Sequence, residues 1–321
     1  MRGKYRVVVR NKRLHYEFEI KRNITIILGD SATGKTTLIK MLRQYMDFGT
    51  DSGISVECDV NCVVLEGRNW KAVLATYSKK IVFIDAGNRF VNTKEFASAI
   101  KGSDNYFVLI TRENLYNLPY SVDEIYKLHS SRKYNNIKKV YHKMSRSYST
   151  EKNRYRYKDI FVVEDSNSGY DFFKGVTKEK DRQCISAKGK SNIYGVLKNT
   201  PKDKSVCVIA DGAALGAEMA RLYQLALQRK NIMFFLPESF EWLILKSGIL
   251  ASHVVKNALL NPEEFIDSKD YFSWEQYFTN LLISEAEDTY FKYNKARLNQ
   301  VYLHDKNKKK IINVIGRYFS L

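Results

Sequence analysis

The sequence predicts an α/β protein in which two parallel sheets follow one another along the chain, with helices after the second sheet. Short runs of β-branched and aromatic residues alternate with stretches whose apolar residues recur at helical spacing. Strands and helices that alternate in this way build parallel sheets with helices on both faces. The alternation starts at the amino end and starts again near residue 159. The 4 prolines and 16 glycines in 321 residues exclude a low-complexity chain.

The two alternations set the expected elements and the domain boundaries. In the first half, strands are predicted at 4–10, 15–28, 60–65, 80–85 and 106–111, with a helix at 36–46. In the second half, strands are predicted at 160–164, 183–186, 205–210 and 231–236, and helices follow at 239–247 and 273–300. We therefore divide the chain into a first domain at 1–126, a basic connector at 127–158, a second domain at 159–247 and a helical region at 248–321.

The chain carries a large excess of positive charge, with 53 Lys and Arg against 35 Asp and Glu and a formal net charge of +18. Residues 127–158 contain eleven of these cations, five tyrosines and a single acid, Glu151. Cations neutralise phosphates and aromatic rings stack on bases, so this segment is a candidate nucleic-acid surface. A solvated, lysine-rich connector is the alternative, and the sequence favours neither.

Composition also bears on where the protein is found. No apolar run reaches the ~18 residues that span a bilayer, so the sequence predicts no membrane segment. The basic amino end lacks the apolar stretch of a secretory signal. Four cysteines in a chain of this length are not a disulfide framework. Together these features predict a cytoplasmic protein.

A phosphate-binding loop is the most specific motif in the sequence. Residues 29–36 read GDSATGKT and fit G-x-x-x-x-G-K-[ST] at every fixed position, between a predicted strand and a predicted helix. Glycines let the backbone turn its N–H groups toward a phosphate, and the helix start adds a positive dipole. In this motif Lys35 contacts the β- and γ-phosphates and Thr36 binds Mg²⁺. The predicted nucleotide contacts are Gly29, Asp30, Ser31, Ala32, Thr33, Gly34, Lys35, Thr36, Thr37 and Asp85.

An acid on the metal side of such a loop is expected at the end of a neighbouring strand. Asp85, which closes the run KIVFID, is the best candidate, and Asp30 inside the loop is a weaker one. Thr111 and Arg112 follow another predicted strand. They are either a polar sensor near the γ-phosphate or ordinary polar residues at a strand end.

The hairpin, strand and phosphate loop of residues 1–125 resemble the opening of ABC-type and OLD-family (overcoming lysogenization defect) ATPases. The chain departs from that pattern, because no LSGGQ-like signature is present and only 49 residues separate Lys35 from Asp85. Ala86 stands where the resemblance implies the glutamate that orients the attacking water. Glu66 and Glu113 are the nearby replacements. ATP and Mg²⁺ binding is therefore a firmer expectation than ATP turnover.

A second constellation is acidic. Glu164 follows the predicted strand 160–164, and Asp211 follows the strand 205–210. Because acids at the carboxyl ends of neighbouring parallel strands converge on one crevice, these two side chains could share a divalent ion. The alternative is that they are acidic loop residues near helix starts.

This layout, over residues 159–236, resembles a Toprim domain, the metal-dependent module of topoisomerases, primases and OLD-family nucleases. Glu164 matches the glutamate of that module, Gly189-Lys190 its turn, and Asp211 the first aspartate. Ala213 stands where the resemblance implies a second aspartate, and two-metal chemistry needs enough negative charge to hold both ions. Four other acids could compensate: Asp165, Glu218, Glu238 and Glu241.

Two functions follow from these motifs. The first is an ATP-binding protein with a nucleotide-controlled, Mg²⁺-dependent action on nucleic acid, of the nuclease type found in bacterial phage defence and mobile elements. In it Thr36 and Asp85 hold the metal of the nucleotide, and Glu164 and Asp211 are catalytic and hold a second metal. The alternative is a non-hydrolytic sensor or assembly subunit with an inactive Toprim-like domain. A small-molecule phosphotransferase is a weaker third hypothesis. An incomplete phosphate site implies a homo-oligomer or a complex with other proteins.

Overall fold

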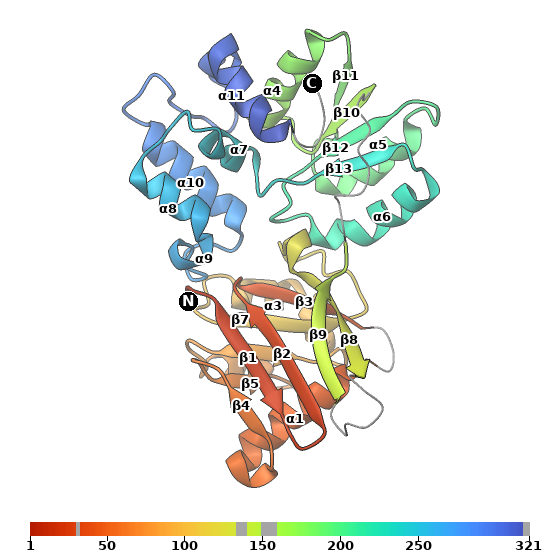
Figure 1. Cartoon of the computed structure of the whole chain (residues 1–321), viewed down its shortest axis with the longest axis vertical. Coiled ribbons are helices and arrows are strands. Elements are labelled where there is room, and N and C mark those ends of the chain that lie inside the picture. The colour runs from red at the N-terminus through yellow and green to blue at the C-terminus, as the bar shows by residue number, and fades with distance from the viewer. Residues whose placement is uncertain (30–32, 133–139, 149–158, 317–321) are drawn as a thin grey trace. The chain divides into compact units, whose positions relative to one another are not determined.

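The computed structural model describes residues 1–29, 33–132, 140–148 and 159–316, which belong to two compact units (Figure 1). Unit 1 comprises Met1–Ser147 together with Pro262–Ser273, and unit 2 comprises Tyr148–Asn261 together with Trp274–Leu321. Each unit combines a sheet with covering helices, which confirms the α/β class. Within the described ranges, every helix is too short or too polar to cross a membrane.

Unit 1 is built on a nine-stranded sheet with the order β4-β1-β2-β9-β8-β3-β7-β6-β5. Its strands are β1 (Tyr5–Arg10), β2 (Leu14–Ile20), β3 (Ile24–Leu28), β4 (Ser55–Glu57), β5 (Cys62–Val64), β6 (Ile81–Ile84), β7 (Tyr106–Thr111), β8 (Ile125–Arg132) and β9 (Val140–Arg146). The strands β3, β7, β6 and β5 are parallel neighbours, whereas β1 pairs antiparallel with β2 and β4. The parallel part therefore presents the carboxyl ends of β3, β6 and β7 along one edge.

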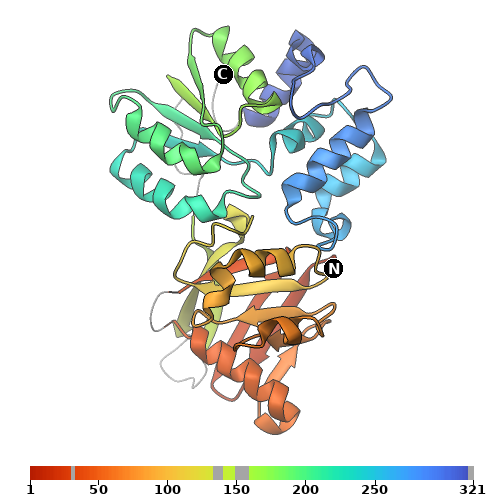
Figure 2. The same ribbon diagram turned by 180° about the vertical axis from the view of Figure 1, so that it is seen from behind.

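Helix α1 (Lys35–Phe48) supplies much of the apolar core of unit 1. Its buried Leu38, Ile39 and Leu42 pack in one cluster with residues of β1, β2, β6 and β7, such as Val7 and Phe83. Figure 2 shows α1 with the shorter helices α2 (Trp70–Leu74) and α3 (Lys94–Ile100) over one side of the sheet. This packing of α1 positions Gly34, which directly precedes the helix.

Three 3-10 turns and one short helix complete the described part of unit 1. The 3-10 turns are η1 (Gly49–Ser52), η2 (Arg89–Asn92) and η3 (Val122–Glu124), and α9 (Pro262–Phe265) comes from the second segment of the unit. That segment is bonded to the first at several points: the N–H of Gly3 donates to the carbonyl of Glu263 at 2.7 Å, and the side chain of Asn23 donates to the carbonyl of Phe272 at 2.7 Å. Residues 262–273 are thus an integral part of this unit.

The predicted basic connector differs most from the structure. Residues 125–132 and 140–146 form β8 and β9, an antiparallel pair that lies inside the sheet between β2 and β3. In these strands Leu128 and His142 are buried, whereas Lys143 and Arg146 are exposed. Because most residues of the segment are polar, this strand-like alternation was not recognised in the sequence. The other basic residues of the segment, at 133–139 and 149–158, lie outside the described residues.

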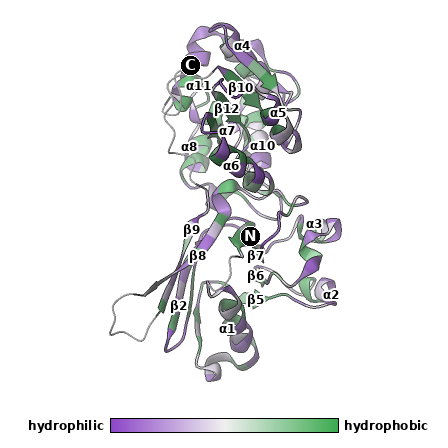
Figure 3. Cartoon of the chain, turned by 90° about the vertical axis from the view of Figure 1, so that its right-hand side faces the viewer, coloured by the Kyte–Doolittle hydropathy of each residue, from purple (hydrophilic) through white to green (hydrophobic). Residues whose placement is uncertain are grey.

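Unit 2 contains a four-stranded, fully parallel sheet with the order β11-β10-β12-β13. Its strands are β10 (Ile160–Val163), β11 (Gln183–Ser186), β12 (Val206–Ile209) and β13 (Ile232–Phe235). Its helices are α4 (Ser168–Lys178), α5 (Ile193–Asn199), α6 (Met219–Gln228), α7 (Phe240–Lys246), α8 (His253–Leu260), α10 (Trp274–Ala286) and α11 (Asp305–Ile315), and its 3-10 turns are η4 (Lys190–Asn192), η5 (Gly216–Glu218) and η6 (Gln300–Leu303). Figure 3 shows the apolar colour concentrated on β10 and β12.

The helix predicted at 273–300 ends at Ala286. The Thr289 hydroxyl donates to the carbonyl of Ala286 at 2.9 Å and accepts the N–H of Phe291 at 3.1 Å, so it competes with the helical hydrogen bonds. The chain then continues without regular structure to η6. This early end lets Tyr293 and Lys295 approach the strand ends of the same unit, where Tyr293 bonds Glu241 of α7.

Candidate functional sites

The glycine-rich turn of unit 1 borders a cavity of about 270 Å³. The cavity is lined by Gly29, Thr33, Gly34, Lys35, Thr36, Thr37, Asp85, Ala86, Ile110 and Arg112. The first seven of these are predicted nucleotide contacts, and Asp85 reaches the cavity from the end of β6. Asp30, Ser31 and Ala32, also predicted as contacts, lie outside the described residues. The structure therefore brings the motif and the acid of a separate strand into one place.

The two glycines of the motif lie so close to neighbouring residues that a side chain at either position would clash with them. Gly34 has a φ of +89°, and a Cβ there would lie 2.8 Å from Cε1 of His142 and 2.9 Å from the hydroxyl of Tyr16. A Cβ on Gly29 would lie 3.1 Å from the carbonyl oxygen of Thr111. Gly29 also donates its N–H to that carbonyl at 2.8 Å. Larger residues would push the turn off its sheet.

An aromatic pair supports the loop, and sequence reasoning missed it. The rings of Tyr16 on β2 and His142 on β9 stack with centroids 4.3 Å apart and planes 7° apart. The Tyr16 hydroxyl donates to the carbonyl of Gly34 at 2.9 Å. Burial lowers the pKa of His142 and raises the pKa of Tyr16 to about 12, so both rings are neutral near pH 7. The strand predicted at 15–28 contains Tyr16, whereas no strand was predicted around His142.

Lys35 and the helix start give the cavity a positive potential. Lys35 is the first residue of the 14-residue helix α1, is 7% exposed, and donates from its ammonium to the Thr33 hydroxyl. The unpaired N–H groups at the start of a helix attract anions. Thr36 and Asp85 line the same cavity and offer the oxygen ligands that Mg²⁺ prefers. This donor set fits a Mg²⁺ ion that arrives with a nucleotide.

The structure brings neither proposed replacement for the water-orienting glutamate to the cavity. Glu66 pairs with Arg43, and Glu113 accepts a hydrogen bond from Asn92. The residues lining the described part of the cavity include Ala86 next to Asp85 and contain no glutamate. The described lining therefore offers no glutamate in the place of a water-orienting base.

Thr111 and Arg112 serve the turn itself. The Thr111 hydroxyl accepts the N–H of Glu113 at 2.9 Å, which supports its interpretation as an ordinary strand-end residue. Arg112 lines the cavity, and its Nε donates to the carbonyl of Gly29 at 2.9 Å. Its guanidinium thus holds the first residue of the loop and adds positive charge beside it.

In unit 2 the structure brings Glu164 and Asp211 together. The register pairs Val163 of β10 with Ile209 of β12, so the residues after both strands share one edge of the sheet. The N–H of Asp211 donates to Oε2 of Glu164 at 3.0 Å. A cavity of about 20 Å³, enough for about one water molecule, is lined by both residues and by Asp165.

Burial and like charges perturb these carboxyl groups. Burial raises the pKa of Glu164 to about 7, although the N–H of Asp211 opposes that shift. Burial also raises the pKa of Asp211 well above its usual range, and the charges of Glu275 and Glu164 add to the effect. Perturbed carboxyl groups of this kind cluster at functional sites but also occur in structural networks.

Four further residues complete the acidic site, and the sequence pattern gave no sign of three of them. Lys295 donates to Oε1 of Glu275 at 2.6 Å. The hydroxyl of Tyr293 donates to the buried carboxylate of Glu241 at 2.8 Å and lies 2.5 Å from the hydroxyl of Ser168. Glu241 was among the predicted compensating acids. The sequence did not indicate a role for Tyr293, Glu275 and Lys295, because the apolar spacing predicted a single helix packed against the core over residues 273–300.

The donor set does not fit a divalent ion on Glu164 and Asp211. Among the described residues, no group of three or more His, Cys, Asp or Glu side chains is arranged to hold a metal. Ala213, in the position of the expected second aspartate, is buried. Of the compensating acids, Asp165 accepts the N–H of Tyr170 at 2.9 Å, whereas Glu218 pairs with Arg221 and Glu238 does not line the cavity.

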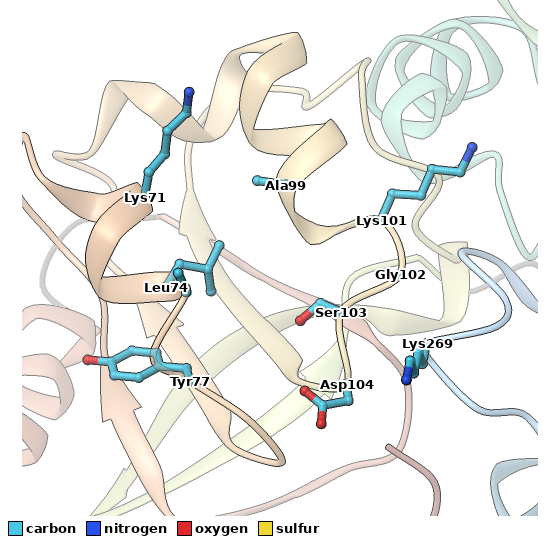
Figure 4. Close-up of a pocket in the computed structure, with 10 residues that line it drawn as sticks. Lys71, Leu74, Tyr77, Ala99, Lys101, Gly102, Ser103, Asp104 and Lys269 are labelled. Carbon is cyan, nitrogen blue, oxygen red and sulfur yellow. The ribbon is translucent and has the colours of Figure 1, made fainter.

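A further cavity of about 470 Å³ lies in unit 1, at the amino ends of β6 and β7 (Figure 4). Lys71, Lys101 and Lys269 stand on its rim and do not converge on one point, and Lys71 pairs with Glu95 outside the lining. The phosphate loop follows β3 at its carboxyl end, so this cavity is separate from it. We assign it no function.

Comparison of the sequence with protein-family models gives no match, and comparison with curated proteins finds no similar sequence. The functional assignment therefore depends on the two sites themselves.

Proposed function

We propose that the chain binds a nucleoside triphosphate with Mg²⁺ at the phosphate loop and acts as a nucleotide-controlled sensor or assembly subunit. One observation carries this proposal: Gly29, Thr33, Gly34, Lys35, Thr36 and Asp85 border a single cavity at the end of a parallel sheet. Ligands of α/β sheets bind at this edge, and phosphates bind at the start of the helix that follows.

Each part of the cavity has a distinct task in this proposal. The backbone N–H groups and the Lys35 ammonium neutralise the β- and γ-phosphates, while Arg112 holds Gly29 at the start of the turn. Thr36 and Asp85 would hold the Mg²⁺ ion, which neutralises phosphate charge when it is bound. Because Ala86 occupies the place of a base, hydrolysis is slow or depends on a partner protein.

The wider context of the proposal is an ABC- or OLD-like ATPase joined to a Toprim-like domain. The four-stranded order of unit 2, with Glu164 and Asp211 after neighbouring strands, supports the second part. The lack of a water-orienting acid and of a three-ligand metal group in the described residues favours a sensor over an enzyme. Nucleic acid is the proposed partner because of the basic segment 127–158, and a second copy or another protein would complete the phosphate site.

A binding titration with a fluorescent ATP analogue and Mg²⁺ tests the proposal. We expect Lys35→Ala to weaken binding by about 100-fold, because it removes a buried, charge-assisted contact to the phosphates. Lys40→Ala, on the exposed face of the same helix, is the matched control and should bind like the unchanged protein. Equal affinity of the two variants would refute the assignment.

A metal-dependent nuclease is the second candidate, favoured by the contact between Asp211 and Glu164 at the strand ends. Incubation with plasmid DNA and with RNA, in Mg²⁺ or Mn²⁺ and with or without ATP, tests it. Cleavage by the unchanged protein that disappears in Glu164→Gln would establish the nuclease. If neither the unchanged protein nor Glu164→Gln cleaves, the sensor is the remaining proposal.

A further inference from the structure

The acidic site of unit 2 gathers five carboxyl groups that are largely removed from water. Glu164, Asp165 and Asp211 follow the strands, Glu241 lies on α7, and Glu275 lies on α10. Glu241 is only 2% exposed, and the other four are partly buried. Carboxylates removed from water in this way need a cation, a proton or hydrogen-bond donors.

We infer that the ammonium of Lys295 is the resident cation of this cluster and holds the carboxylates in the place where related sites would use a divalent ion. Lys295 is bonded to Glu275 at 2.6 Å, and the charges of Glu241 and Asp211 also act on it. Burial by itself would lower the pKa of Lys295, but the charges of Glu241 and Glu275 more than offset burial and raise it. The lysine is therefore a fixed positive charge.

The backbone holds Lys295 at this point from two directions. Its carbonyl accepts the N–H of Ser168, the first residue of α4, at 3.1 Å. Two residues earlier, the hydroxyl of Tyr293 bonds both Glu241 and the side chain of Ser168. The early end of α10 at Ala286 makes this return of the chain possible. The backbone at Lys295 is thus fixed relative to α4 and α7, and the ammonium of its 40% exposed side chain is held by Glu275 of α10.

The same surroundings disfavour a divalent ion. The cavity beside Glu164 and Asp211 has room for about one water molecule, whereas Mg²⁺ keeps several waters in an octahedral shell. Ala213 supplies no ligand, and one oxygen of Asp165 is already bonded to the N–H of Tyr170. A lysine beside these acids also repels a second cation. Nucleotide binding in unit 1 plays no part in this arrangement.

Manganese binding to the intact chain tests the inference, with free Mn²⁺ measured by electron paramagnetic resonance and no nucleotide present. We expect the unchanged protein and Glu164→Gln to bind Mn²⁺ equally weakly. Lys295→Gln should bind Mn²⁺ at least about tenfold more tightly, because it frees the carboxylates, and adding Glu164→Gln should remove that gain. Tight binding by the unchanged protein that is lost in Glu164→Gln would overturn the inference.

Thermal unfolding without metal gives a second readout. Lys295→Gln should lower the Tm by about 10 °C, since it leaves buried carboxylates without their cation. Lys295→Arg keeps the charge and should lose much less, and Lys292→Gln, whose side chain is exposed, is the matched control. If Lys295→Gln does not fold while Lys295→Arg does, the requirement for the cation is supported. An unchanged Tm in Lys295→Gln would refute it.

Discussion

The phosphate loop of unit 1 and the acidic site of unit 2 occupy equivalent places in two sheets but have opposite charge. Both lie where parallel strands end, after β3 and β6 in one unit and after β10 and β12 in the other. In unit 1 the strands lead into backbone N–H groups and the buried Lys35, which favour the binding of an anion. In unit 2 they lead into carboxyl groups, and the chain places its own cation, Lys295, beside them in an ion pair with Glu275. Similar sheet edges therefore differ in the charge of the groups that follow their strands.

The largest effect is expected where the loop of unit 1 has least room. Gly34→Ala places a Cβ 2.8 Å from His142 and strains a φ of +89°, so the turn must move. We expect a loss of about 2–4 kcal/mol in the free energy of unfolding and a loss of nucleotide binding. Urea unfolding and the ATP titration measure the two effects.

Gly67→Ala is the matched control for this change. Gly67 also has a positive φ, of +84°, but a Cβ there meets nothing within 4 Å. It should cost only the backbone strain of about 1–2 kcal/mol and leave nucleotide binding intact. If the two variants lose the same stability and the same affinity, the aromatic support beneath the loop is not what makes Gly34 necessary.

A smaller effect is expected from pH on unit 2. Unfolded Glu164 loses its proton near the ordinary pKa of 4.5, whereas the folded protein keeps it until a pKa of about 7. Between these values folding takes up a proton, so the free energy of unfolding of unit 2 should fall by about 1–3 kcal/mol as the pH rises. Hydrogen exchange of the β10 and β12 amides, corrected for the intrinsic rate at each pH, measures it. Glu164→Gln should flatten this slope, and an equally steep slope in the variant would contradict the assignment.

The smallest effect is expected in unit 1, with the opposite sign. Burial lowers the pKa of His142, so below the ordinary value of 6.5 the unfolded chain binds a proton that the folded chain does not. The free energy of unfolding of unit 1 should therefore fall as the pH drops below 6.5. Exchange of the β2 and β3 amides should show this loss, and His142→Phe should reduce it. A loss that is unchanged in the variant would place its origin in another group.

Local sequence was enough to predict the parts of the fold whose signal is contained in a few adjacent residues. The buried runs ITIIL, IVFI and VCVI are strands β3, β6 and β12, because β-branched and apolar residues suit a strand buried on both faces. The phosphate loop was equally local, since glycines, Lys35 and Thr36 must follow one another for the turn to form. Asp85 was found because the end of a parallel strand is a predictable position.

The rest depended on contacts between distant residues. His142 lies 108 positions after Gly34, on a strand whose charged neighbours concealed its alternation. Lys295 and Tyr293 reach the acidic site because α10 ends at Ala286, where the hydroxyl of Thr289 donates to the Ala286 carbonyl. The apolar spacing of residues 273–300 continues past Ala286, so the sequence pattern does not indicate that the helix ends there. The charge balance of unit 2 could not be predicted without those two residues.

The second segment of unit 1 has a practical consequence for dissecting the protein. Because residues 262–273 return to the first sheet and bond Gly3 and Asn23, the polypeptide crosses from one unit to the other three times. A fragment that ends at Ser147 would lack residues 262–273, which belong to unit 1. A fragment that begins at Tyr148 would contain residues 262–273 without the part of unit 1 that they pack against. Expressing either half alone therefore requires removing residues 262–273 from one fragment or grafting them onto the other.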